Sequence, residues 1–80
     1  MDAEELLRMY AAGERDFTGV KLSKVRLVEK QLRGAIFREA DFSDANLEGT
    51  IFTEADLNYA NLKGALLQEA VFQESRFSFN

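Results

Sequence analysis

The sequence predicts an all-β solenoid of about three square coils that follows one short N-terminal α-helix. The first observation behind this prediction is that Leu or Phe stands at every fifth position from residue 17 to residue 77. The second is that a small residue, most often Ala, stands two places before most of them. Neither an α-helix nor a flat strand keeps a period of five on one face, so the chain must turn once per pentad. About four pentads then close one coil of the solenoid.

Two of the five positions in each pentad are predicted to point inward. The Leu/Phe series forms the structural core and comprises Phe17, Leu22, Leu27, Leu32, Phe37, Phe42, Leu47, Phe52, Leu57, Leu62, Leu67, Phe72 and Phe77. The inward small series includes the alanines Ala35, Ala40, Ala45, Ala55, Ala60, Ala65 and Ala70. Because column mates lie twenty residues apart, these side chains stack along the axis and leave no room inside for a small-molecule substrate.

Two basic residues, Arg15 and Lys30, stand at inward positions of the first coil. A buried, unpaired charge is costly. We therefore expect the first coil to be irregular, or to let both side chains reach solvent through its end.

Asp or Asn precedes the central Leu or Phe in five pentads, at Asp16, Asp41, Asn46, Asp56 and Asn61. Such side chains favour turns because they accept hydrogen bonds from nearby backbone N–H groups. We expect these residues to stabilise the turns rather than to act in catalysis.

Four pentads, at residues 40–44 (ADFSD), 45–49 (ANLEG), 55–59 (ADLNY) and 60–64 (ANLKG), resemble the A-(D/N)-L-X-X repeat of the pentapeptide repeat family. The resemblance extends over residues 15–79. It implies a right-handed quadrilateral β-helix, and the hand comes from the resemblance alone. Some members of that family resemble B-form DNA in size and charge and bind type II topoisomerases, a role that requires a long acidic face.

The N-terminal segment carries helix signals. Asp2 suits an N-cap with Glu5 three residues later, and Gly13 suits a helix stop, so residues 3–12 are expected to be helical. Leu6, Met9 and Tyr10 would cap the open end of the solenoid. The polar face is too acidic for a membrane-surface helix. We therefore divide the chain into a capping helix, residues 1–14, and a repeat domain, residues 15–80.

No second cap is evident at the other end, where Phe77 and Phe79 would leave apolar surface beside unpaired backbone. Exposed edges invite pairing. Two explanations stay open: a homodimer formed through the uncapped C-terminal end, or a chain that is a fragment of a longer solenoid.

Charge varies along the chain, with −3 over residues 1–14, +5 over residues 15–38 and −6 over residues 39–80. The basic segment includes Lys21, Lys24, Arg26, Lys30, Arg33 and Arg38. Column register places Lys21 beside Asp41 and Lys24 beside Asp44, so we expect cross-coil ion pairs. Since no aromatic residue interleaves this segment on the outer face, nucleic-acid binding is not expected.

A few apolar residues fall at outward positions and form the candidate surface for a protein partner: Ile36, Ile51, Val71, Tyr59 and Phe79. Ile51 and Val71 are expected to stack on one face, with Ile36 on the next and Tyr59 below Phe79 at a corner. A contiguous apolar ladder can mark a partner site.

The chain of 80 residues contains no His and no Cys, which removes the usual general base, thiolate nucleophile and soft metal ligands. We therefore expect no enzyme, no cofactor and no metal site. No apolar run is long enough for a membrane span, and the acidic start predicts a cytoplasmic protein. The predicted function is a non-enzymatic rod that presents side chains to a protein partner. The alternative is a DNA mimic that binds a type II topoisomerase such as DNA gyrase, ranked second because the acidic residues are dispersed over four faces.

Overall fold

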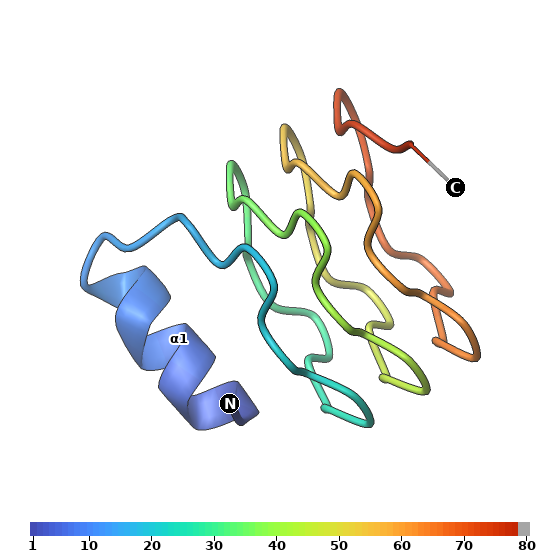
Figure 1. Ribbon diagram of the computed structural model, residues 1–80, viewed down its shortest axis with the longest axis horizontal. Helices are drawn as coiled ribbons and strands as arrows, with labels where there is room; N and C mark the ends of the chain where they lie inside the picture. The colour runs from blue at the N-terminus through green and yellow to red at the C-terminus, as the bar shows by residue number, and fades with distance from the viewer. Residues whose placement is uncertain (79–80) are drawn as a thin grey trace.

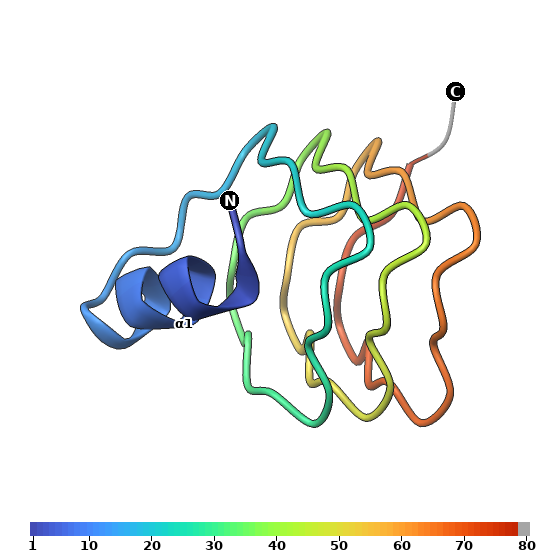
Figure 2. The same cartoon turned by 90° about the horizontal axis from the view of Figure 1, so that it is seen from below.

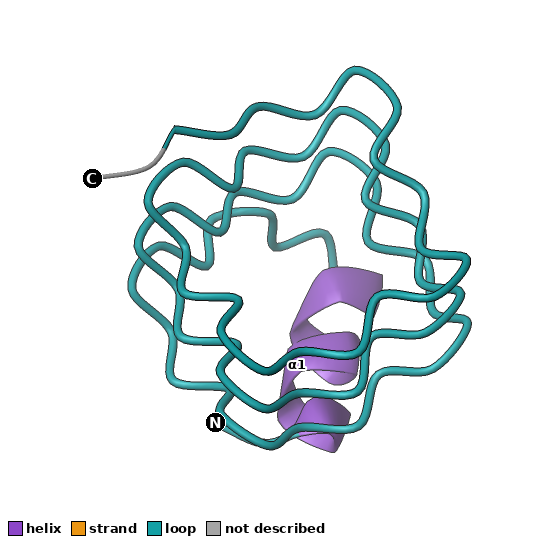
Figure 3. Cartoon of the chain, turned by 90° about the vertical axis from the view of Figure 1, so that its right-hand side faces the viewer, coloured by secondary structure: helices purple, strands orange, loops and turns teal. Residues whose placement is uncertain are grey.

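The computed structural model describes residues 1–78, which form one helix, α1 (Ala3–Ala11), followed by a stack of similar coils. Figures 1 and 2 show α1 at one end of the stack and the C-terminal part of the chain at the other. Within residues 1–78, nine isolated parallel β-bridges join positions twenty residues apart, as in the column that runs from Asp16 through Ile36 and Asp56 to Arg76. Viewed along the stack, the coils lie over one another with α1 behind them (Figure 3).

Each pairing is one residue long because a turn interrupts the chain in every pentad. The N–H of Ala40 donates to the C=O of Phe37 at 3.1 Å, and equivalent bonds recur along the chain. The residue two places after each Leu or Phe, from residue 19 to residue 74, has φ between 56° and 75°. A left-handed residue at this place is typical of a type II turn. We call it the corner residue.

The prediction is confirmed at the level of a repeat solenoid behind one N-terminal helix. Continuous strands, which an all-β fold implied, are not formed within residues 1–78, because the turns leave room for a single bridge residue on each side of the coil.

Backbone hydrogen bonds between coils account for three of the five N–H groups of a typical pentad. The N–H groups of Phe37 and Glu39 donate to the next coil at 2.7 and 2.9 Å, and that of Ile36 donates to the preceding coil at 2.7 Å. A fourth N–H closes the turn. Because four of the five N–H groups of such a pentad are bonded, most of the backbone at the surface of this narrow structure has a hydrogen-bond partner.

The predicted turn role of the Asp and Asn residues is confirmed, because each accepts the remaining N–H of its pentad. The Oδ1 atom accepts from the N–H two residues later at 2.9–3.1 Å in Asp16, Asp41, Asn46, Asp56 and Asn61. Three of these side chains are carboxylates. Their turn hydrogen bonds account for their positions, and no catalytic role is needed to explain them.

The core lies along the axis of the stack. The Leu/Phe positions with exposures of 1% or less are Phe17, Leu22, Leu27, Leu32, Phe37, Phe42, Leu47, Phe52 and Leu57. The alanines buried beside them are Ala35, Ala40, Ala45 and Ala55. Aromatic rings stack along the columns, with centroids 5.5 Å apart for Phe17 and Phe37 and 5.3 Å apart for Phe52 and Phe72. The axis is therefore filled with side chains.

The last coil departs from the predicted core. Phe77 is 37% exposed and is not a core residue. The other inward positions of this coil are only half-buried: Ala60, Leu62, Ala65, Leu67, Ala70 and Phe72. The physical reason is that, within residues 1–78, no further coil packs over them.

Helix α1 closes the opposite end. Asp2 Oδ1 accepts the N–H of Glu5 at 2.8 Å, and the N–H groups of Gly13 and Glu14 donate back to the last turn at 3.0 Å. Gly13 adopts φ of 103°, which favours glycine. The side chains that face the coils are fully buried Leu6 and half-buried Met9 and Tyr10, and the Tyr10 hydroxyl donates to the C=O of Arg33 at 2.7 Å.

The first coil is irregular at both basic positions, as expected. Arg15 lies between α1 and the coil, where its guanidinium carbon is 3.6 Å from the Tyr10 ring centroid. Its Nη1 donates to the C=O groups of Tyr10 and Glu14 at 2.8 Å. Lys30 is exposed, and the turn that precedes it lacks the usual bond from its N–H to the C=O of Leu27. Both charges thus avoid burial.

Candidate functional site

The outer surface of the stack holds the candidate site, since the axis is filled. One hollow of about 240 Å³ is lined by Val28, Glu29, Glu48, Gly49, Gln68 and Glu69. A second, of about 450 Å³, is lined by Ile36, Glu54, Ala55, Asp56, Glu74 and Arg76. Apart from buried Ala55, the lining residues are at outward positions of successive coils, so any ligand would lie against the outside of the rod.

The structure does not join the predicted partner residues into one patch. Ile51 and Val71 form a β-bridge and are half-buried neighbours. Ile36 lies in a different column, between Asp16 and Asp56, because it is fifteen residues from Ile51 and thus on another side of the coil. Tyr59 is 44% exposed at a corner with φ of 63°. Phe79 lies outside the described residues.

Leu66 is the most exposed of the large apolar residues among residues 1–78, and the predicted surface omitted it. Its side chain is 45% exposed, in the column that also holds Arg26 and Asn46. The sequence did carry the signal, because Leu66 is an apolar residue immediately before a central Leu, where the family pattern has Asp or Asn. This surface of the last coil is therefore more apolar than predicted.

The expected cross-coil ion pairs of Lys21 and Lys24 are wrong. Among residues 1–78, the ion pairs within 4.0 Å are Arg33–Glu54, at 2.6 Å, and Arg38–Asp56, at 2.9 Å. Register alone brings the residues of a column together, but the direction of each side chain decides which charges meet.

Local contacts explain why neither the Lys21–Asp41 nor the Lys24–Asp44 ion pair forms. Asp41 Oδ1 accepts the N–H and the hydroxyl of Ser43 at 2.9 and 2.7 Å, which holds the carboxylate within its own turn, and Lys21 forms no ion pair with it. The Asp44 carboxylate leans over Gly64 in the following coil, where a Cβ atom would collide with its Oδ1. Lys24, in the preceding coil, is left without an ion pair among the described residues.

The comparisons with known proteins agree with this repeat geometry. A family model described as Pentapeptide repeats matches eight copies, over residues 16–53 and 50–79. The chain belongs to the pentapeptide repeat family. A search of curated proteins finds no match.

Two carboxylates of this pentapeptide repeat protein are held ionised by their own turns. The hydroxyl of Thr18 and then its N–H lower the pKa of Asp16, and Ser43 lowers the pKa of Asp41 in the same way. Lys21 lowers the pKa of Asp41 further. The negative charge of these turns is therefore part of the repeat structure.

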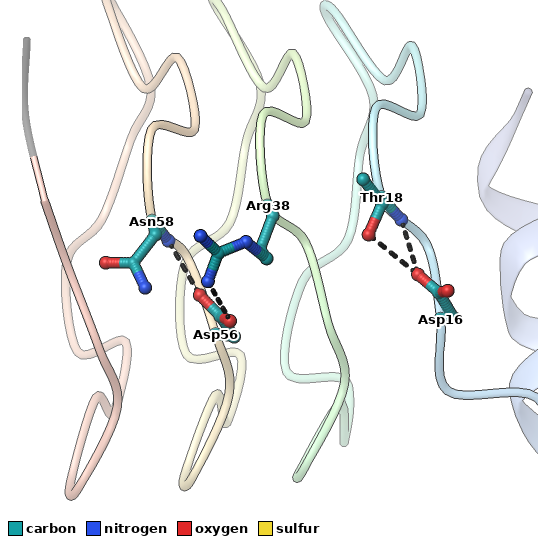
Figure 4. A network of polar contacts seen from close by, with 5 residues as sticks. All are labelled: Asp16, Thr18, Arg38, Asp56 and Asn58. Atoms are coloured by element: carbon teal, nitrogen blue, oxygen red, sulfur yellow. Dashed lines mark hydrogen bonds and ion pairs between the residues drawn. The ribbon is translucent and has the colours of Figure 1, made fainter.

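Asp56 combines a turn bond with an ion pair (Figure 4). Burial opposes its ionisation, but the N–H of Asn58 and the guanidinium of Arg38 together overcome burial and lower its pKa. The same hydrogen bond from Arg38 to Asp56 raises the pKa of Arg38. This pair joins two coils and leaves both charges satisfied, so it is an unsuitable place for acid–base chemistry.

In the part of the chain that the structure describes, the Asp and Glu side chains form no group of three that would hold a metal ion. Over the same residues, no helix has the length and apolarity needed to cross a membrane. The cytoplasmic location stays a prediction.

Proposed function

We propose that this pentapeptide repeat protein is a non-enzymatic interaction module that presents the side chains of a rigid rod to a protein partner. The observation that carries the proposal is the filled axis, in which nine Leu and Phe side chains are at most 1% exposed. Functional groups then lie outside, at fixed spacing on neighbouring coils. Binding sites for small molecules are usually concave and enclosed.

The rod is proposed to be a right-handed quadrilateral β-helix, as the family resemblance implies. Four bridge columns begin within one coil, at Asp16, Lys21, Arg26 and Gln31, which supports a four-sided section. A rod of this kind keeps its side chains in register. Little conformational entropy of the rod is therefore lost when a partner binds.

The proposed contact surface is the half-buried pair Ile51 and Val71, with exposed Leu66 on the adjoining side of the last coil. Apolar residues that line up on successive coils form one continuous surface, which a partner can cover and desolvate as a unit. The basic segment of the first coil is a weaker candidate, because charge without stacked aromatics gives nucleic acid only salt-sensitive affinity.

A quantitative pull-down tests this proposal. Immobilised wild-type chain is compared with the double variant Ile51→Lys/Val71→Lys and with the matched control Gln68→Lys/Gln73→Lys, whose replaced side chains are exposed. A partner that binds wild type and the control but not the Ile51/Val71 variant supports the surface. Equal binding by all three folded proteins would contradict it.

A DNA-mimic role toward a type II topoisomerase is the second candidate. Acidic residues dominate from residue 39 onward, with a net charge of −6 over residues 39–80, which is the observation in its favour. It ranks second because Glu54 and Asp56 are paired with arginines and the first coil is basic. A gyrase supercoiling assay tests it: inhibition or protection of the enzyme by micromolar protein would favour mimicry, and no effect would exclude it.

A further inference from the structure

We propose that the partner presents an amphipathic α-helix, with Lys and Arg on both flanks of an apolar stripe, which lies along the rod over Ile51 and Val71. This inference rests on the proposed function, because it names the class of partner for the same surface. That surface is one outer side of the rod, residues 50–54 and 70–74, which we call the Ile51 side.

The middle of the Ile51 side is uncharged. Residues 50–53 (TIFT) and 70–73 (AVFQ) contain no acidic or basic residue. Ile51 and Val71 form a β-bridge between successive coils, and both are half-buried, so part of each side chain is open to solvent. The two side chains thus make an apolar strip that runs from one coil to the next.

The backbone under this strip is already bonded. The N–H groups of Ile51 and Val71 donate to the preceding coil at 2.8 and 3.0 Å, and their C=O groups accept N–H groups of that coil at 2.9 and 2.7 Å. A partner strand therefore finds no free backbone group here with which to pair. An α-helix bonds its own backbone and offers only side chains, which is what this surface requires.

The spacing of the coils also suits a helix. Hydrogen-bonded coils lie about 4.8 Å apart, and one turn of an α-helix advances about 5.4 Å. A helix that lies along the rod, with an apolar residue at every third or fourth position, would place successive apolar side chains over Ile51 and Val71.

The two margins of the Ile51 side determine the charge of the partner. The corner residues along these margins are glutamate or glycine: Glu29, Gly49 and Glu69 before the side, and Gly34, Glu54 and Glu74 after it. Glu54 is paired with Arg33, whereas Glu69 and Glu74 form no ion pair within residues 1–78. Carboxylates therefore flank the apolar strip on both margins, so a complementary helix carries basic side chains on both flanks.

The two surface hollows lie at these margins and give basic side chains room to bind. The hollow of about 240 Å³ holds Glu29, Glu48 and Glu69 beside half-buried Val28. Gly49 leaves space for Glu29, because a Cβ atom at residue 49 would stand 2.9 Å from Glu29 Cγ. The other hollow includes the two glutamates of the opposite margin. A Lys or Arg side chain can pack its aliphatic part on apolar atoms while its charged group reaches a carboxylate.

The first coil limits the acidic part of this surface. Lys30 is exposed there, and Arg33 lies on the same side. Basic residues of the partner would be repelled by these two cations. The basic part of the helix is therefore expected to lie over the second and third coils, where residues 49–54 and 69–74 contain no Lys or Arg.

The test titrates the ¹⁵N-labelled protein with a synthetic peptide and follows the amide signals by NMR. The probe is an Ala-rich helix of about 18 residues, with Leu at every third or fourth position and Arg on both flanks of the Leu stripe. Shifts are expected to centre on Ile51, Val71, Glu69 and Glu74. Two matched peptides, in which Gln replaces either every Arg or every Leu, are each expected to bind about tenfold more weakly or worse.

A pair of protein variants tests the acidic margins. Glu69→Lys/Glu74→Lys reverses one charge at each margin and is expected to weaken binding of the probe about tenfold or more. Glu4→Lys/Glu39→Lys is the matched control, because it changes the net charge equally at exposed sites away from the Ile51 side and should retain binding. Lys is tolerated at a corner, since Lys24 occupies one with φ of 64°.

The outcomes separate this inference from the proposed function. A probe that does not bind, shifts centred on another side of the rod, undiminished binding of either altered peptide, or equal losses in the two folded variants would each overturn the helix. If the pull-down still identifies a partner that requires Ile51 and Val71, the proposed function stands without it. Equal capture by all three proteins in the pull-down would contradict the proposed function itself.

Discussion

The Thr50 hydroxyl replaces a turn hydrogen bond that the preceding coil lacks at Lys30. It accepts the N–H of Lys30 at 3.2 Å and donates to the C=O of Leu27. In a regular turn these two backbone groups would bond to each other, as those of Ala35 and Leu32 do at 3.2 Å. Lys30 turns outward because its charge cannot be buried, and fully buried Thr50 satisfies the two groups that remain.

Thr50→Val should destabilise the protein by about 1–3 kcal/mol, because it keeps the shape of the side chain but leaves two backbone groups unsatisfied. Unfolding in denaturant, followed by circular dichroism, measures the change. Thr53→Val is the control, since the Thr53 hydroxyl makes no hydrogen bond among residues 1–78 and its loss should cost little. Equal effects of the two substitutions would refute this role of Thr50.

Phe42→Ala should cost about 3–5 kcal/mol, because the ring is fully buried and the cavity cannot collapse easily. Its centroid lies 5.0 Å from that of Phe37 and 6.1 Å from that of Phe52. The free energy of unfolding from denaturant titration measures the loss, and Phe72→Ala, at a half-buried site, should cost less. A loss below about 1 kcal/mol at Phe42 would contradict the packing of the axis.

Two corner residues, Gly34 and Glu39, allow the cost of left-handed backbone to be measured in both directions. Gly34 has φ of 72° and open space around it, so Gly34→Ala should cost about 1–2 kcal/mol through backbone strain alone. Glu39 has φ of 59°. Glu39→Gly should stabilise the protein by up to about 1 kcal/mol, because relief of strain exceeds the entropy that glycine loses. Thermal unfolding of both variants checks the opposite signs, and equal signs would contradict the turn assignment.

Lowering the pH should reduce the stability of the protein because it protonates the turn carboxylates. The pKa values of Asp16 and Asp41 are lowered from 3.8 on folding, so their stabilisation is present above about pH 4 and is lost as pH falls through the lower folded values. Asn accepts the same turn bond at Asn46 and Asn61. The double variant Asp16→Asn/Asp41→Asn should therefore fold while its unfolding free energy depends less on pH.

The matching measurement is denaturant unfolding at neutral pH and near pH 3, with Glu39→Gln as the control because Glu39 accepts no side-chain hydrogen bond within residues 1–78. An unchanged pH dependence in the double variant would show that these turns do not contribute to acid stability.

Leu6→Ala should remove much of the stabilisation that α1 gives to the first coil and lower the free energy of unfolding by about 2–5 kcal/mol. Leu6 is the fully buried residue of the helix, whereas Leu7 is half-buried. Leu7→Ala is thus the matched control and should cost less. Urea unfolding compares the two, and hydrogen exchange of the first-coil amides should increase in the Leu6 variant. Equal losses would indicate that α1 does not cap the stack.

The period of five, read from the sequence, correctly predicted the inward positions of the first coils, because burial in a solenoid depends on residue type at regular spacing. Helix α1 was equally predictable, since Asp2, Glu5 and Gly13 act through local hydrogen bonds. The turn role of the Asp and Asn residues is local as well. The helix and the turns involve residues close together in the chain, whereas the inward positions follow from the regular spacing of the repeat.

The ion pairs and the surface required the tertiary structure. Column register suggested Lys21 with Asp41, but Ser43 holds that carboxylate within its own turn, and Arg38 instead reaches Asp56. Side-chain direction decides such pairs, and a repeat pattern does not specify it.

The amino-acid sequence by itself determined that this chain forms a pentapeptide repeat solenoid behind one helix, because the repeat dictates which side chains can be buried. The tertiary structure decided how Thr50 satisfies the open turn at Lys30, that pairing between coils is limited to single bridges within residues 1–78, and that Leu66 is exposed. These features depend on contacts between residues about twenty positions apart, and such contacts follow from the packing of whole coils.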